Sequence, residues 1–154
     1  YLEERDQILD GGPSTVGVES TIIDCTSAAP RILRPGAITI EMIEESTGLK
    51  VSEEETDIRV SGSLENHYAP QASVFLNRKP IAGEGFIAFA DIQTPESVIR
   101  LASPKSVAEF ARVMYSALRD ADAKGLSSVV VLEPTGSGLA LAIRDRLMRA
   151  SKGR

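Results

Sequence analysis

The stretch SPKSVAEFARVMYSALRDADAKGLSSVVVLEP, residues 103–134, joins a helix pattern directly to a strand pattern. Apolar side chains recur every three or four residues in its first half, which places them on one face of an α-helix. Ser103 predicts the N-cap of this helix, with Pro104 at the first helical position. After Gly125, the run SSVVVLEP predicts a buried strand. The apolar helix face, which we interpret as core, consists of Val107, Phe110, Ala111, Met114, Ala117, Leu118 and Ala121.

Strand and helix patterns alternate around this stretch. ASVFLN (72–77), GFIAFA (85–90) and SVIRLA (97–102) are typical of strands, and SGLALAIRDRLMRAS (137–151) is typical of a helix. This alternation predicts a small α/β domain with a largely parallel sheet. EPTGSGLALAI (133–143) is loosely similar to a phosphate-binding glycine loop, but it has neither the lysine nor a third glycine. We therefore interpret it as a plain turn before the last helix.

The N-terminal part shows a different pattern. STVGVESTIIDCT (14–26) follows a DGGP turn and predicts a strand, and PRILRPGAI (30–38) predicts a second strand that breaks at the Pro-Gly pair. TIEMIEESTG (39–48) predicts a helix with Thr39 as the N-cap and Gly48 as the C-cap. The polar segment that follows is typical of a connector, and within it we predict one short strand at 57–60.

Composition and charge bound the functions that are possible. The 154 residues are 42% hydrophobic and 25% charged, as in globular proteins, and no apolar run is long enough to span a bilayer. The single cysteine excludes an internal disulfide and, with the single histidine, gives too few soft ligands for a structural zinc site. Residues 1–70 carry 14 acids and 5 bases, whereas residues 71–154 carry 8 acids and 12 bases, which suggests two units. Basic residues near the C-terminus suit the end of a helix, so we expect no direct nucleic-acid binding.

Few residues stand out as chemical groups. Ser20 and Thr21 on the first strand, beside Arg34 on the second, form a pattern that could receive an anionic substrate. Hydroxyl residues are common in strands, however, and an arginine before proline is commonly a solvated edge residue. His67, in GSLENHYAP (62–70), is either an exposed loop residue or part of a site. No Ser-His-Asp triad or Walker-type loop is present.

Four ordered motifs resemble one enzyme family. DGGPSTVGVESTIIDCT, RILRPGAIT and VSGSLENHYAP are similar to the second half of a YrdC-type domain and its linker. FARVMYSALRDADAKGLSSVVVLEP and GLALAIRDRLMRAS resemble the C-terminal domain of the longer, Sua-type members of the threonylcarbamoyl-AMP synthase family. The resemblance implies a partial YrdC-like α/β unit over 1–50, a linker over 51–71, and a small Rossmann-like domain with a largely parallel sheet over 72–154.

The resemblance also implies a function. These enzymes, nucleotidyltransferases of tRNA processing, make threonylcarbamoyl-adenylate and pyrophosphate from L-threonine, bicarbonate and ATP. Mg²⁺ is expected through the triphosphate and the N-terminal half of the catalytic domain. The implied site residues are Ser20 for threonine, Arg34, Ser61, Gly62 and Ser63 for the nucleotide, and His67 and Tyr68 as a gate in the linker, with no metal ligand and no catalytic residue among them.

The family's basic N-terminal half has no counterpart in this sequence. We therefore expect Tyr1 to begin partway through the catalytic domain and the chain to be inactive alone. The alternatives are a non-catalytic binding or regulatory module, or a related YrdC-type carbamoyl-transfer protein. We expect a cytoplasmic location, no membrane contact, and other tRNA-modification proteins as possible partners.

Overall fold

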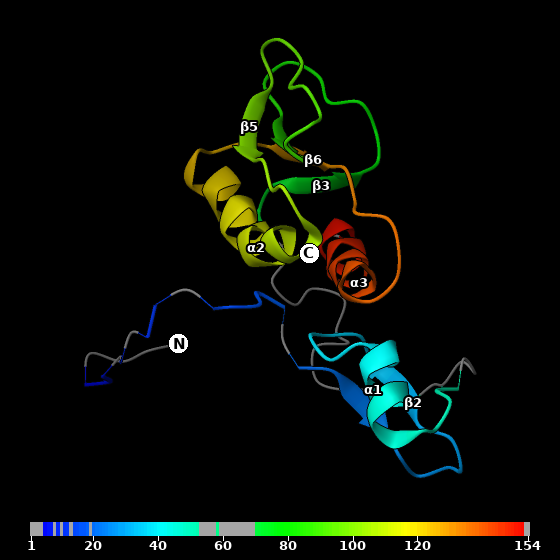
Figure 1. The fold of residues 1–154 in the computed structure, drawn as a ribbon. Helices are drawn as coiled ribbons and strands as arrows, with labels where there is room; N and C mark the ends of the chain where they lie inside the picture. Colours follow the sequence, from blue (N-terminus) through cyan, green and yellow to red (C-terminus); the bar gives the residue numbers. More distant parts are fainter. Residues whose placement is uncertain are drawn as a thin grey trace.

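A four-stranded parallel sheet forms the centre of the C-terminal domain. The computed structural model describes residues 5–7, 9, 11–12, 14–18, 20–52, 58 and 70–152. The strands are β3 (Ser73–Leu76), β4 (Gly85–Ile87), β5 (Ile99–Ala102) and β6 (Ser128–Val131), in the order β3-β6-β4-β5 (Figure 1). Every pairing is parallel. The predicted α/β fold with a largely parallel sheet is therefore confirmed.

Two helices cover one face of this sheet, α2 (Val107–Ala123) and α3 (Leu139–Ser151) (Figure 1). The apolar stripe predicted for α2 is buried, apart from a partly buried Val107. The predicted start of α2 is wrong, because Ser106 is the N-cap and its Oγ accepts a hydrogen bond from Glu109 N at 3.2 Å. Pro104 is instead fully buried before the helix, and its carbonyl oxygen accepts from Ala90 N at 2.9 Å.

Loops and one arginine cover the other face of the sheet. Phe86 and Val130 form a small second cluster there with Ala88. Arg100 donates hydrogen bonds to the carbonyl oxygens of Ala88 and Phe89, both at 2.6 Å, and its guanidinium lies 4.9 Å from the centre of the Phe86 ring. The Arg100 side chain therefore holds the loop that follows β4 against this face of the sheet.

The N-terminal unit is a small antiparallel strand pair followed by a short helix. β1 (Ile22–Asp24) pairs with β2 (Arg31–Arg34), and α1 (Ile40–Thr47) follows. The caps predicted for α1 are confirmed, since Thr39 Oγ1 accepts from Met42 N at 3.3 Å and Gly48 is left-handed with φ 70°. The strand predicted over 14–26 is too long, because among the described residues of this segment only 22–24 meet a partner strand. The short strand predicted at 57–60 lies outside the described residues, apart from Ile58.

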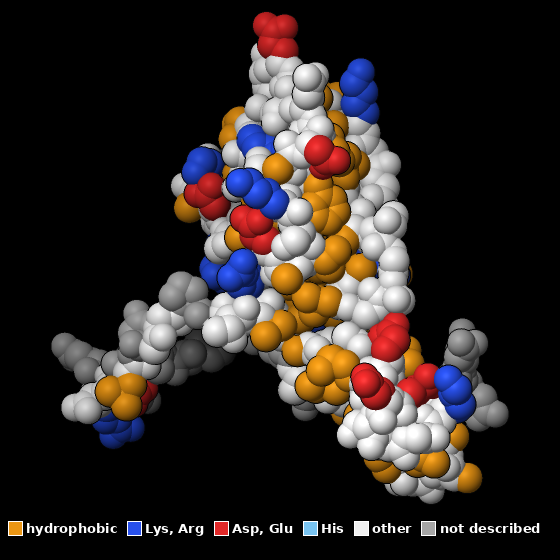
Figure 2. Space-filling model, viewed as in Figure 1, with side chains coloured by type: hydrophobic (Ala, Val, Ile, Leu, Met, Phe, Trp, Pro, Cys, Tyr) orange, Lys and Arg blue, Asp and Glu red, His pale blue; other side chains and the backbone are white. Residues whose placement is uncertain are grey.

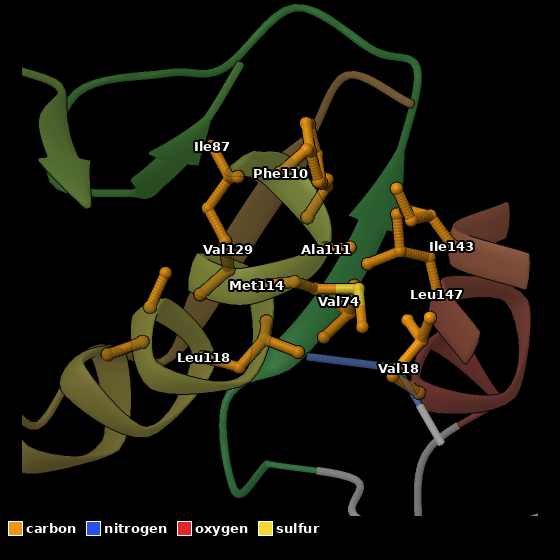
Figure 3. Packing of buried hydrophobic residues seen from close by; sticks show 14 of the residues in the cluster. Val18, Val74, Ile87, Phe110, Ala111, Met114, Leu118, Val129, Ile143 and Leu147 are labelled. Carbon is orange, nitrogen blue, oxygen red and sulfur yellow. The ribbon is translucent and has the colours of Figure 1, made fainter. Parts of the chain in front are cut away.

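The segment before β1 packs against the C-terminal domain. Val18 is 5% exposed and belongs to the main core, where it lies beside Leu147 (Figure 3). Gly17 has φ +82°, and a Cβ atom built on it would lie 2.2 Å from the backbone oxygen of Ala111 in α2. A positive φ and this close approach together require glycine here. The N-terminal unit is therefore attached to the C-terminal domain by the chain on its N-terminal side.

Candidate functional site

The strand pair brings Ser20 and Arg34 into contact. Ile22 pairs with Arg34 across β1 and β2, and the register shifts between Ile22 and Ile23. Arg34 Nη2 donates to the backbone oxygen of Ser20 at 2.9 Å and lies 3.3 Å from Ser20 Oγ. Ser20 is exposed and Arg34 is half-buried. A hydroxyl group and a guanidinium thus lie side by side, although 14 residues separate them in the sequence.

A second arginine on β2 has a structural role. Arg31 Nη2 lies 2.7 Å from Asp24 Oδ2, and Asp24 is 6% exposed. The other carboxylate oxygen of Asp24 accepts from Thr26 Oγ1 at 2.6 Å and from Thr26 N at 2.9 Å. Hydrogen bonds from Thr26 and then from Arg31 lower the pKa of Asp24 to about 2. This ion pair, with the hydrogen bonds from Thr26, fixes the turn between the strands; it was not predicted from the sequence.

The loop after Arg34 is held against β1. Thr21 Oγ1 donates to Ile38 O at 2.5 Å and accepts from Ile38 N at 3.1 Å. Gly36, which lies within this loop, is buried. Thr21, which the sequence placed beside Ser20 as a candidate for substrate binding, instead uses its hydroxyl to close this loop.

A small pocket of about 50 Å³ separates this loop from α3. Glu41, in the first turn of α1, lies at its edge. Hydrogen bonds from its own backbone amide, Thr39 and Ser137 lower the pKa of Glu41. Figure 2 shows hydrophobic side chains continuing from the C-terminal domain onto the unit that carries α1. The pocket lining is mostly apolar and consists of Thr21, Ile32, Pro35, Gly36, Ile38, Thr39, Ile40, Glu41, Ser137, Gly138 and Leu141.

The other predicted site residues lie outside the described part of the chain. These are Ser61, Gly62 and Ser63, predicted for the nucleotide, and His67 and Tyr68, predicted as a gate. Among the residues that are described, no cluster of three or more His, Cys, Asp or Glu side chains could hold a metal ion. Within the same residues, no helix is long and apolar enough to cross a bilayer.

The fold and the site define an α/β protein with a four-stranded parallel sheet and an added antiparallel hairpin that holds an arginine beside a serine. Residues 38–152 match the family profile described as threonylcarbamoyl-AMP synthase, C-terminal domain. The chain therefore belongs to the threonylcarbamoyl-AMP synthase family.

Known relatives extend this likeness over nearly the whole chain. Threonylcarbamoyl-AMP synthase of Pyrococcus abyssi is 32% identical over 165 residues, and that of Bacillus subtilis is 30% identical over 169 residues. These matches cover 94% and 96% of this chain but 48% and 49% of the relatives. The chain thus spans about half the length of the curated relatives that it matches, although the matches cover nearly all of this chain.

Two solved structures share the fold. The crystal structure of P. abyssi Sua5 complexed with L-threonine superposes with a TM-score of 0.74 at 29% identity, covering 93% of this chain and 48% of that one. The second structure is a variant of the same protein in which a histidine and the tyrosine after it are changed to alanine. It gives a TM-score of 0.73 at 28% identity and covers 93% of this chain and 47% of that one.

Some residues of the site carried a weak signal in the sequence. Asp24 and Thr26 form an Asx-type turn, in which the carboxylate binds the amide two residues on, and Arg31 follows in the paired strand. The spacing of these three residues in the sequence could therefore have predicted a hairpin that is held by an ion pair. The contact of Arg146 in α3 with Pro35 O, 111 residues away in the sequence, had no local signal at all.

Proposed function

We propose that this chain supplies the C-terminal half of a threonylcarbamoyl-AMP synthase. The enzyme would join L-threonine, bicarbonate and ATP to give threonylcarbamoyl-adenylate and pyrophosphate. Its product would serve tRNA modification in the cytoplasm, with other tRNA-modification proteins as partners. Family membership supports this proposal, and the observation that carries it is the contact between Arg34 and Ser20.

This contact suits a reaction between two anions. The threonine carbamate must attack the α-phosphate of ATP, so both negative groups have to lie within bonding distance of each other. We propose that Ser20 binds the threonine moiety and that Arg34 binds a nucleotide phosphate through its planar guanidinium. Since Arg34 Nη2 lies 3.3 Å from Ser20 Oγ, the two substrates would be held side by side. The P. abyssi relative solved with L-threonine supports the choice of amino acid.

The linker residues would complete the pocket. We propose that Ser61, Gly62 and Ser63 approach the nucleotide and that His67 and Tyr68 close over it. Carbamates and acyl adenylates decompose in water, so a segment that excludes water would protect the intermediate. In one solved structure of the P. abyssi relative, a consecutive His-Tyr pair is changed to alanine. This variant supports testing His67 and Tyr68 in the present protein.

Metal and triphosphate binding would come from elsewhere. The described residues offer no cluster of carboxylates for Mg²⁺, so we propose that the ion enters with the triphosphate of ATP. Half of a pocket cannot align both substrates, so the 154-residue chain should release no pyrophosphate by itself.

The test compares the chain alone with the enzyme made from the complete reading frame that contains it. We expect threonine- and bicarbonate-dependent pyrophosphate release from the complete enzyme only. Arg34→Ala should raise the KM for ATP roughly 10- to 100-fold, because a charge-assisted hydrogen bond contributes about 1.5–3 kcal/mol. Ser20→Ala should raise the KM for threonine roughly 2- to 10-fold, as expected for a neutral hydrogen bond of about 0.5–1.5 kcal/mol.

The control is Arg112→Ala, which removes an exposed arginine of α2 outside the strand pair. It should leave both KM values unchanged. A complete enzyme without threonine-dependent pyrophosphate release would reject the function and favour a non-catalytic module. Equal effects of the Arg34 and Arg112 substitutions would reject the role given to Arg34.

A further inference from the structure

A buried arginine of the C-terminal domain contacts the loop that follows Arg34. Arg146 lies in the middle of α3 and is only 8% exposed. Its Nη2 donates to the carbonyl oxygen of Pro35 at 3.3 Å, and its Nη1 pairs with Asp145. Asp145 also binds Arg149 at 3.0 Å, so the aspartate keeps a cationic partner if either arginine is changed.

The start of α3 touches the far end of the same loop. A Cβ atom at Gly138 would lie 3.5 Å from Thr39 Cγ2 and 3.8 Å from Glu41 Oε2. The pocket of about 50 Å³ is lined by Thr39 and Gly138 and also by Pro35, the residue that Arg146 contacts. Among the described contacts, the hydrogen bond from Arg146 to the Pro35 carbonyl oxygen links α3 to this loop.

We propose that Arg146 is a positioning residue through which the C-terminal domain orients Arg34 for the nucleotide phosphate. This inference rests on the proposed function of Arg34. Pro35 has a fixed φ and restricts the backbone of the residue before it, so a displacement of its carbonyl group is transmitted to Arg34. The C-terminal domain would in this way contribute to nucleotide binding without touching the nucleotide.

The variant that tests this is Arg146→Met, which keeps an apolar stem in α3 and removes the guanidinium group. The matched control is Arg149→Met, on the same helix and with the same Asp145 partner, but without a bond to Pro35. In the 154-residue chain we measure amide hydrogen exchange at Ile38, whose N–H donates to Thr21 Oγ1 at 3.1 Å in this loop. Exchange should become roughly tenfold faster in Arg146→Met and stay unchanged in the control.

Steady-state kinetics of the complete enzyme then test the link to the nucleotide. Arg146→Met should raise the KM for ATP about 5- to 20-fold, while the KM for threonine stays within about twofold. Arg146→Lys, which restores a cationic donor, should recover part of the loss. Arg149→Met should change neither value.

Each arm can overturn the proposal separately. Equal exchange at Ile38 in the Arg146 and Arg149 variants shows that Arg146 does not hold the loop. Faster exchange with an unchanged KM for ATP, or an equal rise in both KM values, shows that the loop does not orient Arg34. A wild-type enzyme without threonine-dependent activity rejects the proposed function instead, and the exchange result still decides whether Arg146 holds the loop.

Discussion

Glu84 is a buried carboxylate on which four donors converge at the start of β4. It is 6% exposed. Its Oε1 accepts from Arg78 Nη2 at 2.5 Å and from Ser128 Oγ at 2.8 Å, and its Oε2 accepts from Arg78 Nη1 at 2.8 Å and Ile81 N at 2.9 Å. Arg78 also lies over the ring of Phe75 at 4.2 Å. One side chain thus connects the turn after β3 with the starts of β4 and β6.

Glu84→Gln keeps the shape of this side chain and removes its charge. One oxygen becomes an NH₂ group that faces donors, so at least one pair of hydrogen bonds is lost. A hydrogen bond to a charged group contributes about 1.5–3 kcal/mol, and a half-buried Arg78 can regain water, so we expect a loss of about 2–4 kcal/mol. For a protein of this size that loss corresponds to a fall in Tm of roughly 5–15 °C.

Urea unfolding followed by circular dichroism measures this loss, with Glu96→Gln as the control. Glu96 is exposed, so its substitution should change the free energy of unfolding by less than about 0.5 kcal/mol. If Glu84→Gln costs no more than Glu96→Gln, the four hydrogen bonds do not stabilise the fold as reasoned here.

The difference in unfolding free energy between the wild type and Glu84→Gln should depend on pH. The hydrogen bonds from Arg78, above all, and those from Ile81 and Ser128 lower the pKa of Glu84 from its ordinary 4.5 to about 2. The unfolded chain therefore binds the proton more tightly, so the contribution of Glu84 is full above about pH 4.5 and is lost as the pH falls toward 2. The difference in stability between wild type and Glu84→Gln should shrink over this range. A difference that stays constant from pH 6 to 2.5 would contradict this.

Two further substitutions test the core and the N-terminal attachment. Phe110→Ala should cost about 3–5 kcal/mol in urea unfolding, because Phe110 is fully buried in an edge-to-face contact with Phe89 at 5.5 Å; a loss below about 1 kcal/mol would contradict the packing. Gly17→Ala should lower the free energy of unfolding in urea by clearly more than Gly48→Ala, which has no atom within 4 Å and should cost only about 1 kcal/mol; equal losses would contradict the close approach at Gly17.

Local signals in the sequence predicted the elements that depend on local physics. The α1 caps at Thr39 and Gly48 were correct because a cap is made within one turn of the chain. The α2 stripe was correct because its period is a property of the helix itself. The start of α2 was wrong at Ser103, although Ser106 with Glu109 three residues later carried the capping-box spacing.

Elements that depend on distant partners were harder to predict. Residues 14–26 have strand propensity, but a strand needs a pairing partner, and of the residues described there only Ile22–Asp24 pair with β2. The sequence suggested that Ser20 and Arg34 lie near each other because two short strands with a turn between them form a hairpin. It could not indicate the Thr21 bonds to Ile38, which depend on how the loop after the proline folds back.

The two chain segments that flank the N-terminal unit both contact α2. Val18 packs into the core beside α2, and the backbone amides of Gln71 and Ala72 donate to Asp122 near the end of α2, each at 3.0 Å. Residues 19–70, about fifty in number, therefore form a loop closed at both ends. Closing a loop of that length costs about 3.5 kcal/mol of chain entropy. During folding the Val18 contact should accordingly form late, after α2 and the sheet have joined, and mutations at Val18 should speed unfolding without slowing folding.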